Sequence, residues 1–536
     1  MRRPVPGDGD GTLNGQSLQR VTAGWSLRRS RSVFVLTGLL LIVGAAALRF
    51  YRIGSQSLWI DEGFTLLHSD TQSIAATLRL ILASNGTERF SPLYPLFMHG
   101  VVRTWGTSEL ALRSVSALCG VAAVIAVMAA AAALFDKRTA ILAGVLMAAS
   151  SFAVWYSQEA RPYSLMLLLV SLQVWALGRC LRFERRDQTP GGRALMAVIS
   201  GVGLFGNILF AISTLSLSVA HLTVAPDRRR WWSVWWPAAV ASVPAMVFYL
   251  ASPVAESPGA AGVTHLQQNV LMNLGYTIFG QLLGLTYGPP QATLRGLNKL
   301  SDVAGYLPAL MSAVLLGCAL VAAMLMARRL RTSGDPKWSN GVLLEIAIVL
   351  AAGCAGAFVA VTHLNWQPRH AYFVFPPALL VVSFTLSALS RSSHAVLRGQ
   401  AVVTAVALLG ANAWSLYNYY AQPQYGRDDY RSAAAYLNQI RLPGVPSILL
   451  FGKAELMRYY GDSETIDLTE VPDSGVVSQV RALSEPAGEV VVAINRKFYW
   501  WGGTEPTVVF GAAFDVQEIR AFQYFDVYRL RVRATS

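Results

Sequence analysis

Long apolar runs are the feature that most constrains the fold of this chain. Stretches of roughly 17–25 residues, each long enough to cross about 30 Å of hydrocarbon as a helix, recur along the first four fifths of the sequence. Only 14% of the 536 residues are charged, whereas about a quarter are charged in a typical soluble protein. One soluble core cannot account for so many apolar runs. The sequence therefore predicts a polytopic α-helical membrane protein.

The apolar runs divide into eleven predicted membrane helices, an odd number that depends on treating 193–206 and 208–224 as two spans. A further segment, 91–105, is apolar but short and contains His99 and Arg103, so we expect it to lie in the outer membrane interface. The predicted spans lie near 33–50, 110–134, 138–154, 163–181, 193–206, 208–224, 233–252, 304–327, 341–362, 372–390 and 400–420.

The basic residues predict which side of the membrane each loop faces. Clusters such as Arg228-Arg229-Arg230 and Arg328-Arg329 flank predicted spans, as the positive-inside rule expects of cytoplasmic loops. The net charge of +14 is therefore explained by topology and does not indicate nucleic-acid binding. We predict a multi-pass protein of the cell (inner or plasma) membrane with a basic cytoplasmic tail, 1–32. Its extracytoplasmic loops would be 51–109, 155–162, 253–303 and 363–371.

After residue 420 the composition changes to that of a soluble domain. A helix-like stretch follows Arg427-Asp428-Asp429, and short β-type runs alternate with Gly, Pro and Asp. Residues 421–536 are therefore predicted to form a small α/β domain, which the odd number of spans places outside the cell. Its predicted strands are 447–451, 490–494, 507–510 and 524–532.

Three polar groups at the outer ends of predicted helices are the candidate site, since ionisable groups at a membrane are costly and often functional. The first follows the first span, the second lies in the loop after the third span, and the third follows the ninth span. Their candidate residues are Asp61 and Glu62 in the first group, Gln158, Glu159, Arg161 and Tyr163 in the second, and Arg369, His370 and Tyr372 in the third.

Each group has a structural and a functional interpretation. Asp61-Glu62 can cap a helix and interact favourably with the positive end of its dipole. Alternatively, a carboxylate there can act as a general base toward an acceptor hydroxyl. Gln158, Glu159 and Arg161 can form a solvated loop with a local ion pair, or Glu159 can position the acceptor. The guanidinium of Arg369 can snorkel to lipid head groups or fork onto a phosphate.

The order of these motifs resembles a known family. SLWIDEGF after the first span is followed by SPLYPLF, SELALRSVSAL, WYSQEARPYSL and a late QPRHAYFVFPP. This combination resembles the bacterial branch of the GT-C membrane glycosyltransferases, which is related to protein O-mannosyltransferases (glycosyltransferase family 39) and to the aminoarabinose transferase that modifies lipid A. The resemblance covers about residues 33–420.

The resemblance implies roles for the candidate residues. Asp61 would be the catalytic base with Glu62 beside it, and Arg369 would contact the donor phosphate. Gln158-Glu159 stands where the protein O-mannosyltransferase relatives have an Asp, which leaves metal use undecided: no cofactor is certain, and a divalent metal is possible at Asp61 and Glu159. The remaining candidates for binding donor or acceptor are Tyr94, Gln158, Arg161, Tyr163, His370 and Tyr372.

These observations predict a glycosyltransferase that moves a sugar from a polyprenyl-phosphate-linked donor to an extracytoplasmic lipid, glycan or protein acceptor. The type would be hexosyl-, pentosyl- or mannosyltransferase, and the sequence has no Gly-rich loop for a nucleotide sugar. The alternatives are a polytopic secondary transporter, a lipid-linked glycan polymerase or ligase, and a non-catalytic scaffold or flippase partner. The expected partners are the lipid-phosphate donor, the acceptor and membrane lipids, and no nucleic acid.

Overall fold

The computed structural model describes residues 13–84, 87–183, 190–224, 227–251, 270–290, 293, 300–332, 334–362, 366–469, 471, 473–496 and 505–533. About half of the predicted outer loop 253–303, the start of loop 363–371 and residues 1–12 of the predicted tail lie outside the described residues.

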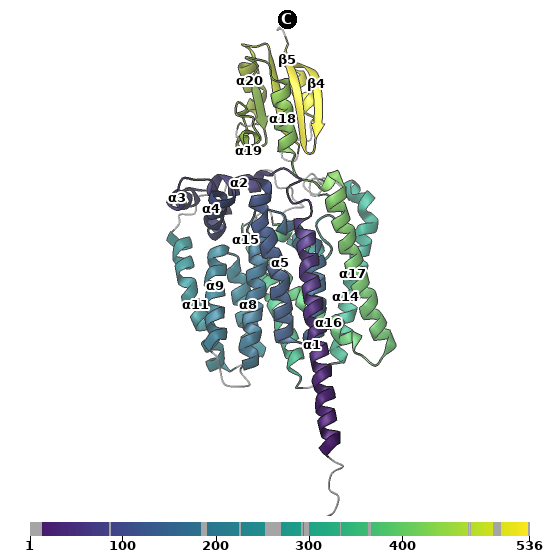
Figure 1. The fold of residues 1–536 in the computed structure, drawn as a ribbon. Helices are drawn as coiled ribbons and strands as arrows, with labels where there is room; N and C mark the ends of the chain where they lie inside the picture. The colour runs from purple at the N-terminus through teal and green to yellow at the C-terminus, as the bar shows by residue number, and fades with distance from the viewer. Residues whose placement is uncertain are drawn as a thin grey trace, which may run out of the picture.

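Most of the described chain is a bundle of helices (Figure 1). The predicted span 138–154 covers the two helices α6 and α7, and each other predicted span coincides with one helix of this bundle, because the apolar runs are long and contain few helix breakers. The helices are α1 (Leu13–Phe50), α5 (Glu109–Leu134), α6 (Lys137–Ala149), α7 (Ser151–Ser157), α8 (Tyr163–Phe183), α9 (Pro190–Gly206), α10 (Phe210–Val224), α11 (Arg228–Ala251), α14 (Leu307–Arg329), α15 (Pro336–Thr362), α16 (Phe375–Ser390) and α17 (Ala395–Ala421).

The lengths of these helices confirm a multi-pass membrane protein. Among the described residues, seven helices are individually long and apolar enough to span a membrane, and α6 with α7 makes an eighth if this pair, bent by 57°, is one span. Helices α9, α10 and α16 are apolar but shorter. The number of eleven spans therefore stays a prediction. Helix α1 also begins at Leu13, so much of the predicted tail 1–32 is helical and continuous with the first span.

Three short helices lie at the end of the bundle nearest the C-terminal domain, which we call the domain end (Figure 1). They are α2 (Ile60–Ser69), α3 (Ile74–Ala83) and α4 (Leu93–Trp105), and α4 coincides with the segment predicted to lie in the interface. Another helix, α12 (Val270–Leu283), falls within the predicted loop 253–303 and was not predicted. The short 3-10 helices are η1 (Thr87–Phe90), η2 (Leu300–Tyr306), η3 (Pro368–Ala371) and η4 (Pro423–Tyr425).

The chain breaks between α6 and α7, and α7 then leads directly into the loop that contains Glu159. The guanidinium of Arg49, buried at the end of α1, donates hydrogen bonds to the carbonyls of Met147 (3.1 Å) and Ala148 (3.3 Å). These carbonyls belong to the last turn of α6, where carbonyl oxygens have no N–H partner within the helix. The positive charge of Arg49 also interacts favourably with the negative end of the helix dipole. The chain then restarts as α7, whose first N–H, that of Ser151, donates to Oδ1 of Asn412 (2.9 Å).

The C-terminal domain is an α/β domain, as predicted, built on one five-stranded sheet of order β2-β1-β3-β5-β4. Strand β1 pairs in parallel with β2 and β3, whereas β5 pairs antiparallel with β3 and β4. The elements are α18 (Tyr430–Ile440), β1 (Ser447–Leu450), α19 (Ala454–Tyr459), β2 (Ile466–Asp467), α20 (Asp473–Ser484), β3 (Glu489–Asn495), α21 (Pro506–Gly511), β4 (Phe514–Phe522) and β5 (Phe525–Val532).

One predicted strand of this domain was wrong. Residues 507–510 belong to helix α21, which has Pro506 in its first turn. Proline is favoured there because its fixed φ suits a helix and its missing N–H would have no partner anyway. The apolar run Thr507 to Phe510 is too short to distinguish strand from helix by its pattern. The prediction also missed β4, which alternates charged and apolar residues on the edge of the sheet.

The C-terminal domain packs directly on the helices of the domain end through one apolar core. Residue Gly63 of α2 lies so close to Leu456 of α19 that a Cβ at Gly63 would be 3.0 Å from its Cγ. A side chain larger than hydrogen at position 63 would therefore require the Leu456 side chain to shift by a few tenths of an ångström. Buried members of this core are Leu58, Tyr94, Met98, Leu112 and Ala160 from the membrane part, and Tyr430, Leu437, Leu456 and Phe525 from the C-terminal domain.

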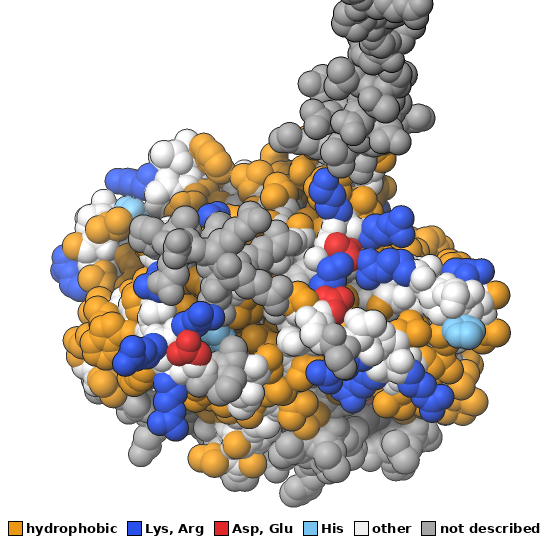
Figure 2. Space-filling model, turned by 90° about the horizontal axis from the view of Figure 1, so that it is seen from below, with side chains coloured by type: hydrophobic (Ala, Val, Ile, Leu, Met, Phe, Trp, Pro, Cys, Tyr) orange, Lys and Arg blue, Asp and Glu red, His pale blue; other side chains and the backbone are white. Residues whose placement is uncertain are grey.

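The opposite end of the bundle is basic. Figure 2 shows Lys and Arg side chains gathered on this face, with few acidic ones among them. Helix α11 begins at Arg228 and α14 ends at Arg329. Asp136, before α6, pairs with Lys337 (3.1 Å) and Arg391 (2.5 Å), and so links three connections of the bundle. By the positive-inside rule, we expect this basic end to face the cytoplasm and the domain end to face outward.

Candidate active site beneath the C-terminal domain

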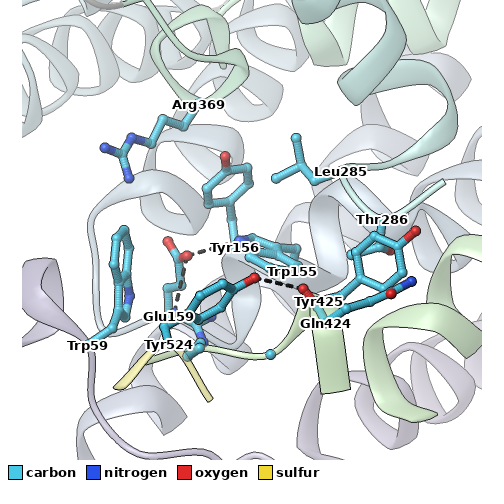
Figure 3. A pocket seen from close by; sticks show the side chains of 12 residues that line it. Trp59, Trp155, Tyr156, Glu159, Leu285, Thr286, Arg369, Gln424, Tyr425 and Tyr524 are labelled. Atoms are coloured by element: carbon cyan, nitrogen blue, oxygen red, sulfur yellow. Dashed lines mark hydrogen bonds and ion pairs between the residues drawn. The ribbon is translucent and has the colours of Figure 1, made fainter. Parts of the chain in front are cut away.

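The three predicted polar groups meet at the domain end. Nη1 of Arg369, in η3, lies 2.8 Å from Oδ2 of Asp61, in the first turn of α2. Arg369 and Glu159 also line one pocket, which they approach from different sides, with Trp59 and Tyr156 beside them (Figure 3). Asp61 is not among the residues that line this pocket, but it adjoins the pocket through Arg369. The lining residues are Trp59, Trp155, Tyr156, Glu159, Leu285, Thr286, Arg369, Gln424, Tyr425, Gly426, Arg427 and Tyr524.

The Arg369 guanidinium is held on three sides. Besides its ion pair with Asp61, it lies over the rings of Trp59 and Tyr163, each 5.6 Å from the guanidinium carbon. Its Nε is buried and has no hydrogen-bond partner among the described residues. An unsatisfied buried donor is costly. This side of the guanidinium is therefore able to bind an anion that enters the pocket.

Glu159 uses only one of its two carboxylate oxygens. Oε1 accepts hydrogen bonds from Nε1 of Trp155 (2.9 Å) and from Nη1 of Arg427 (3.2 Å), whereas Oε2 is buried without a partner among the described residues. Burial raises the pKa of Glu159, and the nearby Arg427 and Arg369 guanidinium groups reduce but do not cancel this rise. A buried carboxylate with a perturbed pKa and a free oxygen in a pocket is a candidate for binding or proton transfer.

Sequence reasoning missed Arg427, although it is central to the site. It follows η4, at the junction between the membrane part and the C-terminal domain, and was treated only as the start of a helical stretch. Its guanidinium carbon lies 5.8 Å from the ring of Trp59 and 5.5 Å from the ring of Trp155. The rule that singled out Arg369, an arginine at the edge of a membrane helix, would also have found Arg427 just beyond α17.

Glu62 is fully occupied by structural partners. Its carboxylate receives Nε (2.8 Å) and Nη2 (2.6 Å) of Arg113, and the backbone N–H of Ala160 (2.8 Å). Burial alone would raise the pKa of Glu62, but the ion pairs with Arg113 and Arg427 outweigh burial and lower it below its usual range. Glu62 is therefore an ion-paired strut between α2 and α5, and it does not have the free oxygen that a general base needs.

Gln158 and Arg161, predicted to bind substrate, instead hold the chain around the site. The Gln158 amide donates to backbone carbonyls at the end of α1 and accepts a hydrogen bond from the hydroxyl of Tyr419 (2.9 Å). Arg161 pairs with Glu88 at 2.5 Å and donates to the backbone carbonyl of Asp61 at 3.0 Å. Neither residue lines the pocket.

The other predicted binding residues are also buried in protein contacts. The hydroxyl of Tyr94 is hydrogen-bonded to Ser116 (2.9 Å), and that of Tyr372 donates to Asn207 (3.1 Å). His370 accepts a backbone N–H within η3 (3.2 Å), and burial, together with the neighbouring Arg369, lowers its pKa to about 3. His370 is therefore neutral. Tyr163 alone among these residues touches the site, through its ring beneath Arg369.

The side chains around Asp61 and Glu159 do not fit the divalent metal that the sequence suggested for these two carboxylates. Asp61 faces the Arg369 guanidinium, and Glu159 faces that of Arg427. In the part of the chain that the structure describes, no three His, Cys, Asp or Glu side chains lie together as metal ligands would. A divalent cation prefers several oxygen ligands without competing cations, and these two carboxylates are each occupied by a guanidinium instead.

Comparisons with known proteins give a family match and a common fold. Residues 90–255 match the family described as dolichyl-phosphate-mannose-protein mannosyltransferase. The crystal structure of ArnT from Cupriavidus metallidurans bound to undecaprenyl phosphate is similar with a TM-score of 0.52 at 12% identity, over 94% of this chain and 98% of that one. The oligosaccharyltransferase AglB from Archaeoglobus fulgidus, in complex with an inhibitory peptide and a dolichol-phosphate, has a TM-score of 0.50 at 12% identity, over 86% and 69%. No curated protein matches by sequence.

Proposed function

We propose that this chain, which has the fold of the GT-C membrane glycosyltransferases, transfers a sugar from a polyprenyl-phosphate carrier to an acceptor at the domain end. The observation that carries the proposal is the Arg369 guanidinium, paired with Asp61 on one side and left with an unpartnered buried Nε on the other. The similar structures were solved with undecaprenyl phosphate and with a dolichol-phosphate, and the matching family is described by a dolichyl-phosphate donor. A lipid-phosphate donor fits each of these observations.

Arg369 would bind the phosphate of the donor. A guanidinium presents donors in a planar fork that suits two phosphate oxygens. As the bond between the sugar and the phosphate breaks, negative charge grows on the leaving polyprenyl phosphate. A fixed cation at that position stabilises the transition state more than the ground state, and it needs no reorganisation during the reaction.

Asp61 would act as the general base. The acceptor hydroxyl attacks the anomeric carbon, its proton passes to the Asp61 carboxylate, and the bond from that carbon to the phosphate oxygen breaks with inversion. The Asp61 side chain is 22% exposed, so an acceptor can reach it, and its partner Arg369 connects it to the phosphate site. Glu159, with its free Oε2 in the pocket, would accept a hydrogen bond from a sugar or acceptor hydroxyl.

The fold also argues against the transporter alternative. Transporters typically bind substrate at the bilayer midplane on interrupted helices, whereas the ionisable residues of this site lie at the ends of helices, beneath a packed soluble domain.

The test is transfer of a radiolabelled sugar in membranes that contain the protein. Membranes would be incubated with undecaprenyl phosphate carrying labelled mannose, a pentose or an aminosugar, and label would be followed into lipid, glycan and protein fractions. We expect transfer from one donor class, with release of undecaprenyl phosphate, and no transfer with the double variant Asp61→Asn, Arg369→Ala. Mass spectra of the envelope from a deletion strain would show the missing sugar. Unchanged envelopes together with no transfer from any donor would refute the proposed function.

A further inference from the structure

The junction between the membrane part and the C-terminal domain sends one charged side chain into the site. Arg427 lies after η4 and before α18, and only 5% of it is exposed. Nη1 is 3.2 Å from Oε1 of Glu159, and Nη2 donates to the backbone carbonyl of Gln158 (3.2 Å). Its guanidinium thus reaches the same pocket as Arg369, but from the C-terminal domain side of the protein.

The backbone around Arg427 is fixed from both sides. Its N–H donates to Oε1 of Gln56 in the loop before α2 (3.0 Å). The carbonyl of the next residue, Asp428, accepts the Ser57 hydroxyl (2.5 Å), and the Asp428 carboxylate accepts the side-chain amide of Asn495 in β3 (3.2 Å). Arg427 can therefore occupy its position only when the C-terminal domain is seated on the loop that leads into α2.

Burying a guanidinium is costly unless carboxylates and hydrogen-bond acceptors compensate. Glu159 provides the close contact, Glu62 lies 3.8 Å from Nη1, and two tryptophan rings provide cation–π contacts. A purely structural cation would not need to end beside the one pocket carboxylate that keeps a free oxygen. The contact with Oε1 fixes the orientation of that carboxylate, so that Oε2 is left for a substrate.

We propose that Arg427 is a positioning residue for sugar transfer: through it, the C-terminal domain orients Glu159 and completes the site of the membrane part. This inference rests on the proposed function. It assigns the C-terminal domain a direct part in the reaction, in addition to packing on the loops. The ligand of the completed site is a hydroxyl group of the donor sugar or of the acceptor, bound by Oε2 of Glu159.

The charge of Arg427 also has a consequence for pH dependence. Burial raises the pKa of Glu159, and Arg427 is the strongest of the groups that oppose this rise. Loss of Arg427 would raise this pKa further, so Glu159 would become protonated at a higher pH and lose its ionised form sooner as pH falls. Among the described residues, the charged and titratable groups that interact with Glu159 include Arg427, Arg369, Asp61, Glu62, Tyr156, Tyr163 and Tyr419.

The experiment compares Arg427→Gln and Arg427→Lys with the wild-type protein in the sugar-transfer assay over pH 5 to 9. For Arg427→Gln we expect kcat to fall about 10²-fold, as a misplaced group can cause, and the acid limb of the pH profile to move up by about 1–3 units, as loss of a neighbouring opposite charge can cause. Arg427→Lys should restore the acid limb, because it restores the charge. It should restore kcat only partly, because an ammonium cannot contact Glu159 and the Gln158 carbonyl in the same fork.

A matched control lies four residues further along the same junction. Arg431 pairs with Glu109 and reaches the carbonyl of Gly54 (3.3 Å), so it also joins the C-terminal domain to the membrane part, but it has no contact with the pocket. Arg431→Gln should lower thermal stability about as much as Arg427→Gln, or less, and leave the pH profile unchanged. In a Glu159→Gln background, Arg427→Gln should no longer move the acid limb.

The outcomes separate this inference from the proposed function. If the wild-type protein transfers no sugar and does not bind undecaprenyl phosphate in native mass spectra, the proposed function fails. If the wild type transfers sugar but Arg427→Gln keeps the wild-type pH profile and kcat, or loses activity only in proportion to lost folded protein, Arg427 does not position Glu159. An equal shift of the acid limb in Arg431→Gln would overturn the inference as well, because it would assign the effect to docking alone.

Discussion

The two adjacent acids, Asp61 and Glu62, differ entirely in their surroundings. They follow one another in the first turn of α2, so their side chains point in directions about 100° apart around the helix. Glu62 points inward to Arg113 and is completely buried, whereas Asp61 points toward Arg369 and stays partly exposed. A motif cannot tell which of two neighbours faces the bundle, because that depends on how α2 is rotated against α5. Of these two neighbours, only Asp61 is therefore a candidate for the base.

Replacing Asp61 tests the proposed base. Asp61→Asn keeps the shape of the side chain but removes the proton acceptor, so we expect transfer to fall by about 10²–10⁴-fold with the protein still folded. The measurement is labelled-sugar transfer in membranes, with expression and thermal stability determined in parallel. Asp70→Asn is the matched control, because Asp70 ends the same helix, is exposed and lies outside the site. Wild-type transfer by Asp61→Asn would move the base assignment to Glu159.

Replacing Arg369 tests the phosphate contact. Arg369→Ala should weaken use of the donor by about 2–5 kcal/mol, the usual cost when a buried charge loses its partner, and the loss should appear mainly as a higher KM for the lipid donor. Arg369→Lys should rescue only part of this loss, since an ammonium cannot fork onto two oxygens. Arg103→Ala, at an exposed arginine of α4, is the control. A variant with unchanged KM and unchanged binding of undecaprenyl phosphate would contradict the phosphate role.

At the scale of elements, the ion pair of Glu62 and Arg113 joins α2 to α5 and so fixes the helix that presents Asp61. Arg113 also donates to the carbonyls of Ile53 and Ser57 (both 2.9 Å), in the loop before α2. One buried arginine of α5 thus provides hydrogen-bond donors both to the loop carbonyls before α2 and to the Glu62 carboxylate in α2. The position of Asp61 is set by this strut as much as by the residues around it.

Breaking the strut should reduce stability. Glu62→Gln leaves the Arg113 charge without its counter-ion, so we expect the free energy of unfolding to fall by about 3–5 kcal/mol, measured by thermal or denaturant unfolding in detergent. Because the pKa of Glu62 is lowered in the folded protein, the stabilisation is complete above its unfolded pKa and is lost as pH falls through the folded value. The wild type should therefore lose more stability than Glu62→Gln on acidification below about pH 4. Glu345→Gln, which breaks a half-exposed pair with Arg328, should cost about 0–1 kcal/mol.

The prediction of helix or strand succeeded where the apolar runs of the sequence were long, and failed where these runs were short. The membrane helices follow from apolar length alone, and the strands at 447–450 and 489–495 follow from β-branched and apolar runs between turn residues. The helix at 506–511 was missed because its few apolar residues fit either structure and tertiary packing decides between them. Helix α12 was missed because its residues were assigned to the outer loop 253–303. The partners of Arg161 and Gln158 could not be predicted either, because they come from segments far away in the sequence.

At the scale of the whole molecule, the order of five motifs predicted the GT-C fold, and the structural similarity confirms it. Three of these motifs contribute residues to the site: SLWIDEGF contributes Asp61, WYSQEARPYSL contributes Glu159, and QPRHAYFVFPP contributes Arg369. The part that the motifs did not reveal is the role of the junction after α17. Arg427 belongs to no recognised motif, and its place in the site depends on how the C-terminal domain is seated.

The separation of the two ends predicts the orientation of the molecule in the membrane. The polar site and the C-terminal domain are at one end, and the basic connections, including those at Arg228 and Arg329, are at the other (Figures 1 and 2). The positive-inside rule retains such connections in the cytoplasm. The lipid-linked donor and the acceptor would then meet on the outer side, where no nucleotide sugar is available.

Reporter fusions test this orientation. Alkaline phosphatase fused after residue 536 should be active, because phosphatase folds only outside the cytoplasm and the C-terminal domain lies at the end opposite the basic connections. The same reporter placed after residue 331, between α14 and α15, should be inactive, and a fluorescent protein at that position should fluoresce. An inactive phosphatase after residue 536 with an active one after residue 331 would invert the molecule. The site would then face the cytoplasm, and the proposed transfer on the outer side would have to be abandoned.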